Sequence, residues 1–223
     1  MKAKIVYEDE EILVCHKPAG LATQTGRVGQ QDLVSEIKNY LGTNPYLGLI
    51  HRLDQPVEGL LVFAKTAPAA KELSRQLTDS ILNKQYLAIV LGKGFSKETT
   101  LENYLIKDNK TNTSRVAGEK EKGAKQAKLL AKTLFYNEEK QISKIEVTLF
   151  TGRHHQIRVQ LANAGLRLLG DSKYGTEASI ARSKELGVRN VALCANHLTF
   201  LHPKTKKAMD FQIEPEGEIF NSI

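Results

Sequence analysis

The chain has few cysteines and only short apolar runs, which argues against several classes of protein. Its 223 residues include two cysteines, Cys15 and Cys194, with no CxxC pair and no Cys/His spacing typical of a metal site. Both lie inside apolar segments, as buried thiols do in a reducing compartment. No apolar run approaches the ~20 residues of a membrane-spanning helix, and the first residues lack a signal-peptide pattern. We therefore expect a cytoplasmic protein without disulfides, a metal site or a membrane partner.

Signatures of nucleotide-dependent and serine-hydrolase chemistry are also absent. The chain contains no P-loop, no dinucleotide-binding GxGxxG loop and no GxSxG segment. The adjacent residues His154 and His155 lack the i,i+4 spacing of a helical zinc pair. These patterns give no sign of a bound cofactor.

Positive charge is in excess. The chain has 32 Lys and Arg against 25 Asp and Glu, a formal net charge of +7. Such a surplus favours polyanion partners, because each neutralised phosphate releases condensed counterions. Many basic proteins have no such partner, so charge alone decides nothing. The composition, 41% hydrophobic and 26% charged, is ordinary for a globular protein.

Short apolar runs and a few helical patterns follow one another irregularly along the chain. Strands outnumber helices, which predicts a single α+β domain over residues 1–223 with a mixed, mainly antiparallel β-sheet and flanking helices. Asp32 is a candidate N-cap, and Lys-rich polar residues over 107–125 predict a mobile basic loop. The expected strands are 4–7, 12–17, 59–65 (covered on both faces), 84–92, 126–136, 142–150, 191–195, 197–201 and 208–213, and the expected helices are 33–41, 67–82 and 154–164.

A first candidate site is the segment His51-Arg52-Leu53-Asp54-Gln55-Pro56, between two apolar runs. Pro56 interrupts a regular strand, so Asp54 is expected on an irregular loop held by buried elements. That placement suits a catalytic carboxylate, which must meet substrate from a rigid support. Composition alone favours a simpler reading, a surface loop in which Arg52 and Asp54 pair with each other.

A second candidate is Arg158, at the end of the segment TGRHHQIR that opens a predicted helix. Ile157, Leu161 and Ala164 form the apolar stripe of that helix, and Arg158 lies about 100° around from Ile157. A partly buried arginine needs an anion, and Asp54 is the natural one. Such a pair would lower the pKa of Asp54 and keep it ionised. The alternative is a solvated charge on the flank of the helix.

A third candidate is Tyr86, in the strand-like segment KQYLAIVLG. Its ring could stack on a planar base, an interaction worth ~1–3 kcal/mol per base in single-strand recognition. Without further observations a structural tyrosine is the simpler reading.

Six segments, taken in order, resemble the RluA-type RNA pseudouridine synthases. The most specific pair is HRLD at 51–54 with GRHHQIR at 152–158. The resemblance covers nearly the whole chain. The six segments are KPAGL at 17–21, HRLD to GLLVFAK at 51–65, NKQYLAIVLG at 83–92, TGRHHQIRVQLANAG at 151–165, LLGDSKYG at 168–175 and LCANHLTFLHP at 193–203.

The resemblance implies a role for each candidate. Asp54 matches the family's catalytic aspartate, Arg158 its arginine partner, Tyr86 the tyrosine that packs on the target uracil, and Arg52 a contact to the flipped nucleotide. The family converts uridine in RNA to pseudouridine without a metal or organic cofactor. The partner expected here is therefore ribosomal or transfer RNA, bound by a monomer. Further expected RNA contacts are His51, Arg153, Lys17, Lys120, Lys122 and Lys125.

Two departures from the family pattern concern RNA selection. Val57 and Glu58 stand where the family usually has Thr-Ser, and the charge of Glu58 could raise the pKa of Asp54. The small N-terminal RNA-binding domain of many relatives is not expected, so the basic loop is a hypothetical source of phosphate contacts. Two other functions stay open. One is a catalytically inactive RNA-binding protein or chaperone of the same fold, and the other is a nucleosidase or glycosidase with Glu58 as its second carboxylate.

Overall fold

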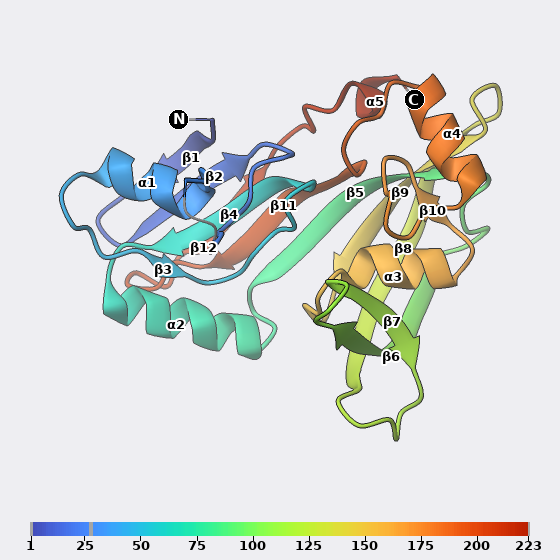
Figure 1. Cartoon of the computed structure of the whole chain (residues 1–223). Coiled ribbons are helices and arrows are strands. Elements are labelled where there is room, and N and C mark those ends of the chain that lie inside the picture. Colours follow the sequence, from blue (N-terminus) through green and yellow to red (C-terminus); the bar gives the residue numbers. More distant parts are fainter. Residues whose placement is uncertain (1, 27–28, 223) are drawn as a thin grey trace. The chain divides into compact units, whose positions relative to one another are not determined.

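The computed structural model describes residues 2–26 and 29–222 and has an α+β architecture (Figure 1). The chain forms two compact units. The first comprises Met1–Lys84 and Cys194–Pro215, and the second comprises Gln85–Leu193 and Glu216–Ile223. Each unit has its own strands and helices. The fold class expected from the sequence is confirmed, while the single domain over residues 1–223 stays a prediction.

Four strands, in the order β1 (Lys4–Glu8), β2 (Ile12–Lys17), β4 (Glu58–Ala64) and β11 (Leu193–Leu201), form the sheet of the first unit. β3 (Gly48–Leu49) pairs with β4, and β12 (Ala208–Gln212) with β11. All these pairs are antiparallel except β4 with β11, which is parallel. The predicted strands 191–195 and 197–201 are one strand, β11, which begins at Leu193 and runs through Asn196 to Leu201.

Two helices accompany this sheet. Asp32 caps α1 (Leu33–Leu41) as predicted, since its carboxylate accepts the Ser35 N–H at 2.7 Å. Helix α2 (Ala67–Thr78) is shorter than predicted because Ser80 has a φ of 58°, which is not helical. Apolar side chains of α2, β2, β4 and β11 form one core together with Leu82, which follows α2: Ile12, Val14, Leu60, Val62, Ala64, Ala69, Leu73, Leu82, Leu198 and Phe200. Strand β4 is buried along its whole length, as a strand covered on both faces should be.

Five strands, in the order β5 (Asn83–Leu91), β9 (Ile142–Leu149), β8 (Lys125–Asn137), β6 (Thr99–Asp108) and β7 (Thr113–Ala117), form the sheet of the second unit. The pairs β9–β8, β8–β6 and β6–β7 are antiparallel. The prediction of one basic loop over 107–125 is wrong. That segment contains the end of β6, a turn and all of β7, since β6 offers an edge with which residues 113–117 pair. Strand β6 itself has no counterpart in the prediction.

Helix α3 (Gln156–Asn163) differs from the amphipathic helix expected over 154–164. It begins later, because His155 has a φ of 55° and cannot be helical. Residues 156–162 are all buried, including three polar ones. Two of these bond to the backbone of β8: Gln156 Nε2 donates to Lys128 O at 3.1 Å, and Gln160 Nε2 to Ala127 O at 3.2 Å. Hydrogen bonding, rather than an apolar stripe, therefore accounts for the burial of its polar side.

The second unit also contains short elements that the sequence pattern did not predict. They are β10 (Arg167–Leu168), α4 (Glu177–Glu185) and α5 (Glu218–Asn221). Helix α4 carries little apolar periodicity and is started instead by a capping box between Thr176 and Ser179. Within the described part of the chain, none of the helices is both long and apolar enough to cross a membrane.

Candidate functional site

Asp54 begins a tight turn that leads into β4. The Val57 N–H donates to the Asp54 carbonyl at 3.1 Å and closes the turn. On its other side Leu53 is buried, and its backbone is held by the Thr23 hydroxyl, which accepts the Leu53 N–H at 3.2 Å and donates to the Leu53 carbonyl at 2.8 Å. The irregular but well-supported loop predicted for Asp54 is present.

The side chain of Lys17 supports this turn through hydrogen bonds. Its side chain is 0% exposed, and its ammonium donates to the carbonyls of Pro18 (3.0 Å), Leu21 (2.7 Å) and Gln55 (3.3 Å). Burial lowers the pKa of Lys17 to about 8, against the opposing charges of Asp54 and other nearby groups. The expected contact of Lys17 with RNA is therefore corrected. An ammonium enclosed by three carbonyls supports the Asp54 turn and presents no surface to a phosphate.

His51 and Arg52 precede the turn and differ in exposure. His51 is buried, and its Nε2 accepts the Val62 N–H at 3.3 Å. Burial lowers the pKa of His51 well below 6.5, so the ring is neutral, and its expected contact with RNA stays a prediction. Arg52 is exposed, and its Nη2 donates to the Gln24 carbonyl at 3.3 Å. Arg52 thus keeps the accessibility that a substrate contact requires.

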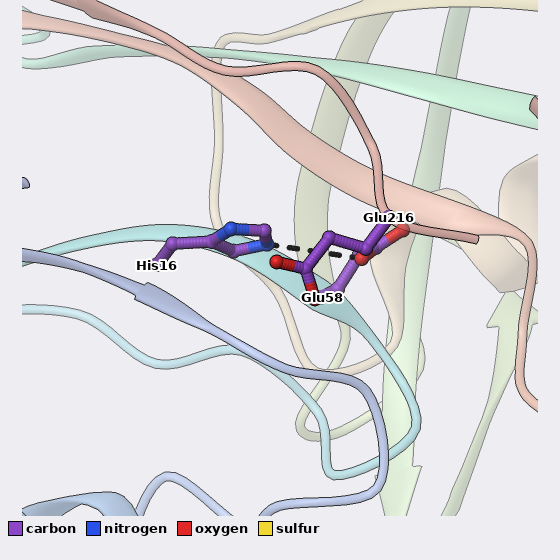
Figure 2. Close-up of side chains that lie close together, drawn as sticks. All are labelled: His16, Glu58 and Glu216. Carbon is purple, nitrogen blue, oxygen red and sulfur yellow. Dashed lines mark ion pairs between the residues drawn. The ribbon is translucent and has the colours of Figure 1, made fainter. Parts of the chain in front are cut away.

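Glu58, the first residue of β4, lies beside the neighbouring strand β2. Its carboxylate is 3.7 Å from Nε2 of His16, and both side chains are buried (Figure 2). The negative charge of Glu58, like that of Asp54, favours the protonated form of Lys17. The predicted influence of Glu58 on Asp54 itself stays a prediction.

Arg158, on α3, forms a buried ion pair within the second unit. Its Nε donates to Asp171 Oδ2 and its Nη2 to Asp171 Oδ1, both at 2.7 Å. The two side chains are 4% and 1% exposed. The pairing predicted between Arg158 and Asp54 would join the two units and stays a prediction. Asp171 was not among the predicted site residues, although it lies in the family-like segment LLGDSKYG at 168–175.

Tyr174 connects Arg158 to its surroundings. Its ring centroid is 5.1 Å from the guanidinium carbon of Arg158. Its hydroxyl accepts the Ser114 N–H at 2.7 Å and lies 2.7 Å from Nδ1 of His155. The ring of His155 stacks on that of His154 with centroids 3.7 Å apart. Sequence reasoning missed Tyr174 as well, because nothing in its spacing points to Arg158.

The other predicted site residues of the second unit lie on separate elements. Arg153 is exposed, and its Nε donates to the Gln126 carbonyl at 2.8 Å. Tyr86, on β5, is 5% exposed. The three predicted lysines are exposed in the turn before β8 or at the start of that strand: Lys120, Lys122 and Lys125.

Each unit therefore holds one polar constellation on a rigid frame. The first unit offers a carboxylate on a closed turn next to an exposed guanidinium. The second offers a buried arginine that pairs with Asp171 and lies against the ring of Tyr174, whose hydroxyl is next to His155. These groups supply acid–base and anion-binding chemistry.

The chain resembles proteins of one family in both sequence and structure. A family model described as RNA pseudouridylate synthase matches residues 11–163. Ribosomal large subunit pseudouridine synthase D of Zymomonas mobilis is 34% identical over 225 residues, with 95% of this chain and 68% of that protein covered. Ribosomal large subunit pseudouridine synthase C of Haemophilus ducreyi is 30% identical over 211 residues, with 94% and 64% covered.

The chain thus spans about two thirds of the length of these relatives. Among solved structures, human RNA pseudouridylate synthase domain containing 1 has a TM-score of 0.78 at 21% identity, with 96% of this chain and 83% of that chain covered, and shares the fold. The resemblance seen in the sequence is confirmed: the chain belongs to the RNA pseudouridylate synthase family.

Proposed function

We propose that this chain converts uridine in RNA, in the first place ribosomal RNA, to pseudouridine, with Asp54 as the essential carboxylate. Family membership supports the reaction, and the names of the two bacterial relatives support the kind of RNA. The observation that carries the assignment of Asp54 is its turn. The Val57 N–H bonds to the Asp54 backbone carbonyl and the Thr23 hydroxyl holds the Leu53 backbone, so the residue that bears the carboxylate is fixed in place.

The reaction is an isomerisation and needs no oxidant or second substrate. The bond between N1 and C1′ breaks, the uracil turns in place, C5 bonds to C1′, and a proton moves from C5 to N1. An ionised carboxylate can act in this sequence as a nucleophile or as a base. A paired base must first leave its stack, which costs a few kcal/mol and favours loops and single strands.

The remaining candidates fit supporting roles. Arg52 is exposed beside Asp54 and can contact the flipped nucleotide, and Tyr86 offers a ring for the uracil. Arg153, Lys120, Lys122 and Lys125 are exposed and positively charged, as phosphate contacts require. We also propose that the protein is a monomer, that it lies in the cytoplasm and that it acts on transfer RNA as well.

Replacement of Asp54 tests this function. Asp54→Asn keeps the size of the side chain and removes its charge. We expect pseudouridine formation on ribosomal RNA to fall by at least about 1,000-fold, because both proposed roles need the carboxylate. RNA affinity should stay within about threefold, because phosphate contacts dominate binding. Pseudouridine mapping and filter binding measure the two quantities.

Asp79→Asn, at the exposed C-cap of α2, is the matched control and should keep full activity. Normal product formation by Asp54→Asn would refute the role of Asp54. A wild-type protein that binds RNA but makes no product would favour the inactive RNA-binding protein, and release of free uracil would favour the nucleosidase.

A further inference from the structure

The turn at residues 168–175 has no role in the proposed reaction, yet its backbone is packed too tightly for ordinary residues at two positions. Gly170 has a φ of 74°, and a Cβ there would lie 1.9 Å from the Asn190 carbonyl oxygen. A Cβ on Gly175 would lie 2.4 Å from the Asp171 carbonyl oxygen. Glycine at both positions allows a compact turn around Asp171.

This turn fixes the carboxylate of Asp171. Oδ1 of Asp171 accepts the backbone N–H groups of Lys173 at 3.0 Å and Tyr174 at 3.3 Å. Its carbonyl accepts the Gly175 N–H at 2.9 Å. Backbone donors, which cannot rotate away as side chains do, therefore set the direction in which the carboxylate points.

The same turn holds Arg158 from two sides. Asp171 binds the edge formed by Nε and Nη2, and the Tyr174 ring lies against the guanidinium face, 5.1 Å from its central carbon. Rotation of the guanidinium would break the bidentate pair and lose the ring contact together. The pair with Asp171 uses Nε and Nη2 and fixes the guanidinium plane, so it also sets the direction of the Nη1 donors.

We infer that Asp171 is a positioning residue for Arg158: it fixes the guanidinium plane and thereby directs the Nη1 donors to the group that Arg158 serves during the reaction. Tyr174 covers the face of the guanidinium. Its hydroxyl also binds the Ser114 backbone of β7, which anchors the ring. This inference rests on the proposed function, because it assigns Arg158 a task in that reaction.

A double-mutant cycle tests the inference. Single-turnover rates at saturating RNA, and RNA affinities, are measured for wild type, Asp171→Asn, Arg158→Lys and the double variant. We expect Asp171→Asn to lower the rate about 10- to 100-fold, as a small misplacement of a catalytic partner does, with RNA affinity within about twofold. In the Arg158→Lys background the same change should cause no further loss, because Asp171 acts through Arg158.

Two further variants complete the experiment. Asp79→Asn removes a carboxylate from an exposed pair with Arg75 and should leave the rate unchanged. Asp171→Glu keeps the buried charge but displaces the carboxylate. If Asp171→Asn does not fold, Asp171→Glu takes its place in the cycle with the same expected loss of rate at unchanged affinity.

Three results would overturn the inference. One is a wild-type rate for a folded Asp171 variant, and another is a loss that multiplies with that of Arg158→Lys, which would show a structural role alone. The third is a variant whose whole defect lies in RNA affinity. If the rate of Arg158→Lys is too slow to measure, the Asp171 variant alone decides. A lower rate at unchanged RNA affinity supports the inference, and a defect in RNA affinity alone overturns it. If the wild-type protein forms no pseudouridine, the proposed function is refuted. If the wild type is active and the Asp171 variants give one of these three results, only the inference on Asp171 is refuted.

Discussion

At the scale of single residues, charge and burial separate side chains that look alike in the sequence. Lys17 and Arg52 are both cations near Asp54, and both were expected to contact RNA. Lys17 is enclosed by three carbonyls, whereas Arg52 is exposed. The family motif identifies both positions but does not reveal which cation faces solvent, because burial depends on the strands packed around them.

The lowered pKa of Lys17 predicts a pH-dependent contribution to stability. In the unfolded chain the pKa is near its ordinary value of 10.5, and in the folded protein the pKa is about 8. Between these values the unfolded state holds one more proton, so this group makes the protein more stable as pH rises. The difference in unfolding free energy between wild type and Lys17→Met should therefore grow from about pH 8 to 10.5, by an order of 3 kcal/mol.

Urea unfolding of both proteins across this range measures the effect, and groups that the two proteins share cancel in the difference. A difference that stays constant or shrinks with rising pH would show that burial does not lower the pKa of Lys17.

At the scale of elements, the strand that follows the Asp54 turn depends on Gly59. This residue has a φ of 133°, and a Cβ there would lie 2.5 Å from the backbone N and O of Ala195 on β11. The parallel pair between β4 and β11 joins Gly59 to Ala195. Gly59→Ala should therefore destabilise the protein by about 3 kcal/mol or more, through strain and a clash with backbone that has little room to move.

Gly92→Ala provides the matched control, because Gly92 has a φ of 83° with nothing within 4 Å of an added Cβ. It should cost only the conformational strain, about 1–2 kcal/mol. Thermal or urea unfolding compares the two variants. Equal losses would mean that the close approach to Ala195 adds nothing beyond strain.

Some helices and strands can be predicted from sequence patterns and others cannot. Strands β1, β2 and β4, and helix α1 with its Asp32 cap, were all predicted, because short-range capping and apolar runs specify them. Strand β7 was missed because its five residues carry no strong apolar alternation and pair only where β6 offers an edge. Helix α3 was predicted, but its burial on all sides follows from carbonyls of β8 that the sequence does not place.

At the scale of the whole molecule, the excess of positive charge predicts salt-dependent RNA binding. If Lys120, Lys122 and Lys125 contact phosphates, changing all three to Gln should reduce the slope of log affinity against log salt by about 2, since each contact to single-stranded RNA contributes about 0.7. Filter binding at several salt concentrations measures the slope.

A triple change of Lys2, Lys4 and Lys38 to Gln is the control. These exposed lysines of the first unit alter the net charge equally. We expect a smaller change of slope for the control, because the slope counts phosphate contacts rather than net charge. Equal slopes for the two triple variants would argue against a specific role of the turn before β8.

The sequence by itself determined the family, the fold class and the candidate aspartate, because those depend on local motifs and on the order in which they occur. Only the tertiary structure decided which charges are buried and what they bind. Lys17 and His51 are enclosed, and Arg158 pairs with Asp171, 13 residues further along the chain. A buried charge takes the partner that the packed strands and turns bring within reach, and spacing along the chain does not specify that partner.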